Sequence, residues 1–237
     1  MAYLDVEATN GDREIGSAFH VGSGIFVTAR HVVQGKRIVE MRQTEPVTVG
    51  SRENFQKFPD LSDETLQEYD KAHEEWTGLK PTFPRYLEPL EIIEGPFYDK
   101  DEISDVAVLR VREIHPAAAI VKLGIHWDDW VYRNIWNLTD AIIMGYPPVP
   151  MVNQPVLISA RAEIHTFVTP RHDLSIHFIL SATPRGGFSG GVAIYEDGDA
   201  LGVITSSFVN DGLPEQTGFL AVLSIEAIVK CLQFNGL

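Results

Sequence analysis

Short runs of apolar residues separated by turn-forming residues make up most of this chain. In residues 18–33, β-branched and aromatic runs flank Gly22-Ser23-Gly24, a pattern that predicts a hairpin. Short strands at this spacing are typical of an all-β barrel or sandwich, and not of alternating strands and helices. Further runs predict strands at 38–41, 46–49, 105–111, 141–144, 156–162, 175–180, 191–195, 201–206 and 218–223.

Two segments depart from the strand pattern. Residues 63–76 are strongly polar, and their few apolar residues recur at helical spacing, before a stretch that prolines interrupt. We therefore expect a helical insertion over about 51–100, either a solvated surface helix or a docking or regulatory element. Residues 225–234 have an apolar face and predict a helix that closes the fold.

Composition and charge narrow the class of protein. Of the 237 residues, 44% are apolar and 22% charged, as in a globular chain of one large or two small domains. The net charge of −14 repels phosphate backbones, so we expect no nucleic-acid partner. The one cysteine, Cys231, permits no disulfide within the chain, and no secretory signal or membrane-spanning run is evident. These features predict a cytoplasmic protein with no membrane partner.

The strongest sign of chemistry is Gly-Phe-Ser-Gly-Gly at residues 187–191. A nucleophilic serine needs backbone N–H groups that converge on one oxyanion, and glycines let the backbone approach a substrate closely. The pentapeptide also fits the nucleophile elbow of α/β-hydrolases, in which a histidine follows the serine. No histidine follows Ser189, so that arrangement would need a base from another chain.

The order of the candidate residues distinguishes the remaining serine-hydrolase arrangements. A subtilisin-like order needs an acid before the base His31, and no acidic residue there lies in a buried-strand context. The order His, Asp, Ser fits His31, Asp105 and Ser189. Asp99 and Asp101 compete with Asp105, but they lie in a charged loop without a following apolar strand. The acids excluded from the subtilisin-like order are Asp5, Glu7, Asp12 and Glu14.

Three sequence blocks in this order resemble the trypsin-like serine peptidases. Residues 28–33 (TARHVV) resemble the Thr-Ala-x-His block, residues 104–109 (SDVAVL) the aspartate strand, and residues 187–191 the nucleophile loop. Residues 144–147 (MGYP) and 218–221 (GFLA) are softer matches, the second to bacterial HtrA/Deg-type protease domains. The resemblance covers most of the chain outside the insertion.

The resemblance implies an all-β fold of two six-stranded antiparallel β-barrels. The first barrel, residues 1–125, would carry His31 and Asp105 together with the insertion. The second, residues 126–237, would carry Ser189 and end in a helix. No PDZ-type domain follows within this chain, unlike many HtrA-type relatives.

The resemblance also implies a role for each site residue. His31 would act as general base and then general acid, Asp105 would hold its tautomer, and Ser189 would attack the scissile carbonyl. The backbone N–H groups of Gly187 and Ser189 would form the oxyanion hole. No metal or cofactor is expected.

Specificity and activation are the points at which the sequence departs from the family. Thr183 would lie at the base of the primary specificity pocket, and no carboxylate there supports a strict Lys/Arg preference. Phe188 replaces the usual Asp or Asn before the nucleophile, which raises the prospect of a loop ordered by a partner or substrate. Thr205, Ser206 and Ser207 would line the wall of the pocket.

The sequence thus predicts a serine endopeptidase that cleaves protein or peptide substrates through an acyl-enzyme. A dedicated partner or activator protein fits the compact chain. The alternative is a catalytically silent or latent peptide-binding or scaffold module on the same fold. An esterase is a third option.

Overall fold

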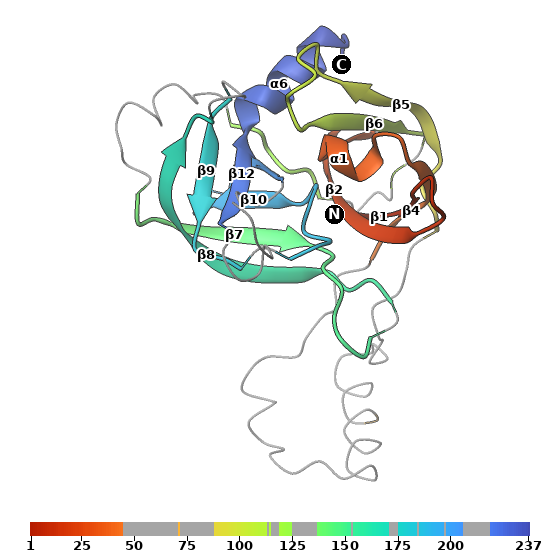
Figure 1. The fold of residues 1–237 in the computed structure, drawn as a ribbon, viewed down its shortest axis with the longest axis horizontal. Helices are drawn as coiled ribbons and strands as arrows, with labels where there is room; N and C mark the ends of the chain where they lie inside the picture. The colour runs from red at the N-terminus through yellow and green to blue at the C-terminus, as the bar shows by residue number, and fades with distance from the viewer. Residues whose placement is uncertain are drawn as a thin grey trace. The chain divides into compact units, whose positions relative to one another are not determined.

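In the computed structural model, the described secondary structure is mainly β-strand, arranged in two sheets (Figure 1). Residues 1–43 and 88–237 belong to one compact unit, and Thr44–Leu87 form a second. Both sheets and the candidate site lie in the first unit. The described residues are 1–44, 71, 88–112, 114, 119–124, 137–152, 154–170, 175–183, 185–196, 198–205 and 219–237.

The first sheet is antiparallel and has the strand order β4-β1-β2-β3-β6-β5. It is curled, since the N–H of Leu90, just before β5, donates to the carbonyl of Met41 in β4 at 2.8 Å. The short helix α1 (Arg30–Val33) follows β3 directly. The strands are β1 (Ala2–Glu7), β2 (Arg13–Gly22), β3 (Ile25–Thr28), β4 (Arg37–Gln43), β5 (Ile92–Tyr98) and β6 (Ala107–Val111).

The second sheet is a closed barrel with the strand order β10-β11-β12-β9-β8-β7. The helix α6 (Ile225–Phe234) leaves β12 and covers one end of the fold (Figure 1). No helix among the described residues is long and apolar enough to cross a membrane. The strands are β7 (Asp140–Gly145), β8 (Ile158–Val168), β9 (His177–Leu180), β10 (Val192–Tyr195), β11 (Ala200–Ile204) and β12 (Leu220–Ser224).

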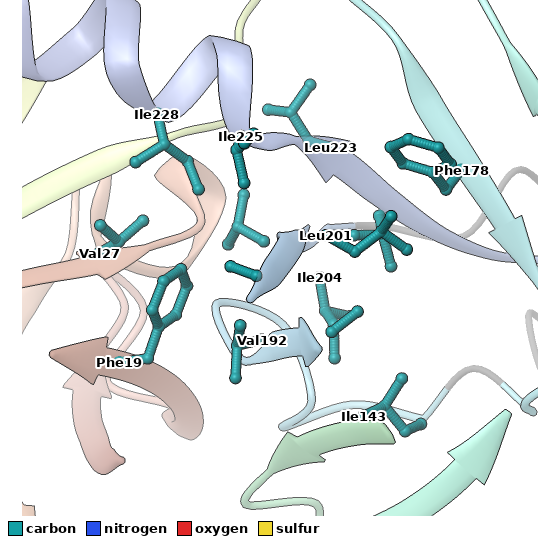
Figure 2. Close-up of a cluster of buried hydrophobic side chains, with 14 of the residues drawn as sticks. Phe19, Val27, Ile143, Phe178, Val192, Leu201, Ile204, Leu223, Ile225 and Ile228 are labelled. Carbon is teal, nitrogen blue, oxygen red and sulfur yellow. The ribbon is translucent and has the colours of Figure 1, made fainter. Parts of the chain in front are cut away.

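The side chains of β2, β3 and β6 alternate between the core of the first sheet and the core of the second barrel. Successive side chains of a strand point to opposite faces. Phe26 and Leu109 therefore lie inside the first sheet, whereas Phe19 and Val27 join the larger cluster of the second barrel. Figure 2 shows Phe19 and Val27 beside Val192 and the helix residues Ile225 and Ile228. Strands buried on both faces fix the register of the sheet that carries the candidate base.

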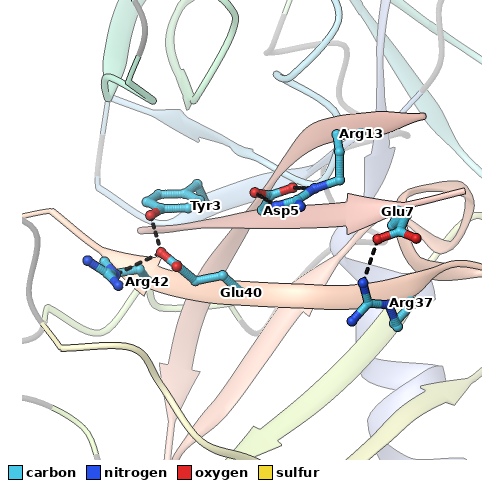
Figure 3. A network of polar contacts seen from close by, with 7 residues as sticks. All are labelled: Tyr3, Asp5, Glu7, Arg13, Arg37, Glu40 and Arg42. Carbon is cyan, nitrogen blue, oxygen red and sulfur yellow. Dashed lines mark hydrogen bonds and ion pairs between the residues drawn. The ribbon is translucent and has the colours of Figure 1, made fainter. Parts of the chain in front are cut away.

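The outer face of the first sheet carries cross-strand polar pairs (Figure 3). Arg37 of β4 pairs with Glu7 of β1 at 2.5 Å, Arg13 of β2 pairs with Asp5, and Glu40 accepts from Tyr3. Such exposed pairs contribute little to stability, because solvent and salt screen them. Their larger effect is to alternate with buried Leu4 and Val6, which sets the face that β1 turns inward.

The predicted fold is confirmed, with two differences. Both sheets have six antiparallel strands and α6 closes the chain, but the described residues of the first sheet form a curled sheet and not a closed barrel. The interval 51–100 is not wholly an insertion, because β5 belongs to the first sheet. Pro96 breaks the strand pattern in the sequence, so β5 was not predicted. A proline is tolerated there because β5 is an edge strand. The predicted helix over 63–76, apart from Lys71, and the domain boundary at 125/126 lie outside the described residues.

The thiol of Cys231 on α6 is expected to be unreactive in the folded protein. The residue is fully buried; burial, and next the charge of Asp99, raise the pKa of the thiol to about 12. The thiolate is the reactive form, and only roughly one in 10⁴ such thiols is ionised at pH 8. Intact mass after iodoacetamide at pH 8 should show no adduct on folded protein and one adduct in denaturant. Alkylation at equal rates in both states would contradict this prediction.

Candidate active site

The first sheet places His31 and Asp105 at the same end of two paired strands. β3 and β6 are antiparallel, with Thr28 opposite Ala107. His31 follows the end of β3 and Asp105 precedes the start of β6, so both residues lie at the same end of this strand pair. Val32 and Val33 of α1 are buried and hold the short helix against the sheet.

Both carboxylate oxygens of Asp105 contact His31. Oδ1 accepts the backbone N–H of His31 at 2.9 Å, and Oδ2 lies 2.7 Å from the ring Nδ1. An ionised carboxylate only accepts hydrogen bonds, so the ring proton lies on Nδ1 and the lone pair on Nε2. The His31 side chain is 43% exposed, so a ligand can reach its ring. The pair has the tautomer and the access that a general base needs.

The loop between β9 and β10 carries Ser189 against the strand that leads to His31. Gly190 has a φ of +81°, and a Cβ there would lie 2.1 Å from the carbonyl oxygen of Ser17 and 2.3 Å from Thr28 Oγ1. The loop backbone therefore contacts the end of β3, three residues before His31. Within the described part of the chain, no hydrogen bond joins the Ser189 hydroxyl to His31.

Phe188 anchors the nucleophile loop in the second barrel. Its side chain is 4% exposed and belongs to the larger core cluster. The N–H of Gly191 donates to the Phe188 carbonyl, and the N–H of Gly190 to the Ile204 carbonyl, both at 2.8 Å. Hydrophobic burial of the Phe188 side chain thus holds this loop in place.

Within residues 187–191, two backbone N–H groups have no acceptor among the described residues. The N–H groups of Phe188, Gly190 and Gly191 donate to carbonyl oxygens, whereas those of Gly187 and Ser189 do not. Gly187 has a φ of +83°, a left-handed conformation that favours glycine. Donors free to bind a ligand are what an oxyanion hole requires.

Of the predicted specificity residues, the structure describes Thr183 and Thr205. Thr183 is exposed and lines a cavity of about 530 Å³ with Arg185, Phe188 and prolines of the β7–β8 loop. Thr205 is 5% exposed, donates to the Ala221 carbonyl at 3.4 Å, and does not line that cavity. Ser206 and Ser207 lie outside the described residues.

Sequence reasoning missed contacts that hold the neighbours of the candidate triad. The Arg30 guanidinium lies 4.7 Å from the centre of the Tyr98 ring, a cation–π contact beside His31. Asn235 at the end of α6 donates to the Tyr98 carbonyl at 2.9 Å. No sequence motif predicts these long-range contacts, because they join residues of separate elements. Across the described ranges, no cluster of His, Cys, Asp or Glu residues could hold a metal ion.

Comparison with solved structures shows what the fold is similar to. The Rv3671c protease from M. tuberculosis, in its active form, has a TM-score of 0.58 and 17% identity over 98% of this chain and 78% of that chain. The HtrA-type protease AlgW with a tripeptide has a TM-score of 0.55 and 15% identity over 99% and 60% of the two chains. The serine endoprotease from Yersinia pestis has a TM-score of 0.53 and 14% identity over 98% and 61%. This chain thus spans about three fifths of the last two.

Comparison of sequences identifies the family. No curated protein sequence matches the chain. A family model described as a trypsin-like peptidase domain matches residues 16–203, a span that includes His31, Asp105 and Ser189. Since this match covers most of the chain, the protein belongs to the trypsin-like peptidase family of serine endopeptidases.

Proposed function

We propose that this protein cleaves polypeptides with a catalytic triad of His31, Asp105 and Ser189. The observation that carries the proposal is the contact of both Asp105 carboxylate oxygens with His31, at 2.9 and 2.7 Å. The packing of Gly190 against Thr28, next to this pair, supports it. The N–H groups of Gly187 and Ser189, which have no acceptor among the described residues, provide candidate oxyanion donors. The single cysteine favours a cytoplasmic location.

In this mechanism Ser189 Oγ attacks the scissile carbonyl carbon while its proton passes to His31 Nε2. The carbonyl oxygen becomes an oxyanion that the N–H groups of Gly187 and Ser189 bind. The tetrahedral intermediate collapses, and the leaving amine takes the proton from His31. Water then attacks the acyl-enzyme by the same route and releases Ser189. Asp105 stabilises the imidazolium in both stages.

A latent or silent peptide-binding module is the second candidate function. It is favoured by the lack of a Ser189–His31 hydrogen bond among the described residues. Catalytic hydrogen bonds are often long in unliganded enzymes and tighten only when substrate binds. The buried Phe188 also anchors the nucleophile loop without a partner. We therefore favour the enzyme over the module.

Cleavage of a peptide library tests the proposed activity. Peptides from a digested proteome should acquire new termini with wild-type protein and none with Ser189→Ala, because only the wild type has the nucleophile. We expect cleavage sites that are not restricted to Lys and Arg, since Thr183 offers no carboxylate to pair with them. A narrow set of sites would support a dedicated substrate protein, and many unrelated sites would contradict it. New termini in equal amount with both proteins would overturn the assignment of Ser189.

A further inference from the structure

Ser17 lies on β2 of the first sheet, yet most of its polar contacts are with the second barrel. The residue is fully buried. Its Oγ donates to the Gly187 carbonyl at 2.6 Å and accepts the N–H of Tyr146 at 2.9 Å. Its backbone N–H donates to the Ser189 carbonyl at 2.8 Å, and its own carbonyl accepts from Thr28 Oγ1 at 2.7 Å. A hydroxyl has one proton to donate, and that of Ser17 is committed to Gly187.

These bonds hold the two peptide groups on either side of the N–H of Ser189. The carbonyl of Gly187 belongs to the 187–188 peptide, and the carbonyl of Ser189 belongs to the 189–190 peptide. The peptide between them carries the N–H of Ser189, one of the two candidate oxyanion donors. Since a peptide group is planar, fixing both neighbours restricts the rotation that would turn this N–H away.

The same residue also links the nucleophile loop to β3, the strand that leads to His31. Thr28 ends β3, three residues before His31, and its hydroxyl donates to the Ser17 carbonyl. Gly190 packs against both Ser17 and Thr28, so no side chain separates the loop from the strand. Ser17 therefore lies where the base, the nucleophile and the oxyanion donors meet.

We infer that Ser17 is a positioning residue that holds the nucleophile loop and its oxyanion donors in register with His31. This inference rests on the proposed function. Ser17 contacts neither substrate nor the reacting atoms in the mechanism above. It acts through the backbone of Gly187 and Ser189, so its loss should slow the chemical step more than it weakens substrate binding.

Ser17→Ala is the direct test, with a fluorophosphonate as the probe. In this reaction Ser189 Oγ bonds to phosphorus, fluoride leaves, and His31 takes the hydroxyl proton. The variant removes the buried hydroxyl that the Gly187 carbonyl and the Tyr146 N–H bind. Displacement of the loop by about 1 Å is expected to lower the rate constant for labelling by about 10²-fold. With a p-nitrophenyl ester, kcat should fall by a similar factor while KM changes little.

The rate constant separates positioning from a merely structural role. Partial unfolding would lower the final amount of labelled protein, whereas a displaced loop lowers the rate constant of the folded fraction. Ser224→Ala is the matched control, since Ser224 is also a buried serine (2% exposed) but lies at the end of β12. It should be labelled at the wild-type rate. Thermal denaturation of each variant reports the folded state.

If Ser17→Ala does not fold, a second pair of variants tests the positioning role of Ser17. Thr28→Val removes the hydroxyl that donates to Ser17 and keeps the shape, while Thr28→Ser keeps the hydroxyl. We expect labelling about tenfold slower with valine and close to wild type with serine. If wild-type protein is not labelled at Ser189, the proposed function itself fails. If wild type is labelled and folded Ser17→Ala reacts at the same rate, the inference about Ser17 is overturned.

Discussion

Asp105→Asn is expected to lower the rate of peptide hydrolysis about 10⁴-fold without loss of the fold, as the same change does in the well-studied triads. The geometry gives the reason for a loss of this size. Asp105 uses one oxygen for the His31 backbone N–H and the other for Nδ1. Asparagine has one acceptor oxygen, so it can satisfy only one of these two contacts.

Either orientation of the asparagine amide disrupts the base. If its NH₂ group faces Nδ1, the ring proton moves to Nε2 and no lone pair remains to accept the Ser189 proton. If its oxygen faces Nδ1, the NH₂ group meets the backbone N–H of His31, and α1 is pushed away. The measurement is the rate of new-terminus formation from the peptide library, together with thermal denaturation of the variant.

Asp101→Asn is the matched control for this substitution. Asp101 lies in the exposed loop before β6, and its Oδ1 accepts the N–H of Ile103 at 3.0 Å. Asparagine keeps that acceptor, so activity should stay at the wild-type level. A full loss with Asp101→Asn, or wild-type activity with Asp105→Asn, would show that the acid of the triad has been assigned to the wrong residue.

Gly190→Ala is expected to destabilise the protein by about 2–5 kcal/mol and to abolish activity. Two costs add at this position. A left-handed backbone costs a non-glycine residue about 1–2 kcal/mol, and overpacking a tight contact costs about 1–3 kcal/mol. The new methyl would lie 2.1 Å from the Ser17 carbonyl oxygen, so the loop and the end of β3 must separate. Thermal denaturation should show a midpoint lower by roughly 10 °C.

Gly186→Ala provides the control within the same loop. A Cβ on Gly186 meets no atom within 4 Å. Its stability should therefore stay within about 0.5 kcal/mol of wild type, as for most surface substitutions. Equal midpoints for Gly190→Ala and Gly186→Ala would mean that the close contact between the nucleophile loop and β3 does not exist in solution.

Local sequence patterns were sufficient to predict most of the strands. The hairpin around Gly22-Ser23-Gly24 is confirmed as β2 and β3, and the run at 105–111 contains β6. Two strands were missed. In β1, charged residues of the outer ion pairs alternate with buried ones and make the segment look polar, and in β5 a proline breaks the apolar pattern.

The contact between His31 and Asp105 was also predictable, because both residues lie in short blocks of recognisable residues. The positioning role of Ser17 was not predictable, because no neighbouring sequence motif distinguishes this serine from any other serine in a strand. Its partners lie 129 and 170 residues away, at Tyr146 and Gly187, and only the folded chain brings them together. The specificity pocket assigned to Thr183 and Thr205 stays a prediction. Pocket walls depend on loop paths that single residues do not determine.

The most direct measurement is the intact mass of wild-type protein and Ser189→Ala after treatment with a fluorophosphonate. Only a serine activated by a base reacts readily with this probe. An assembled site predicts one adduct on the wild type, located on Ser189, and none on the variant. An unlabelled wild type, or the same adduct on both proteins, would contradict a nucleophilic role for Ser189.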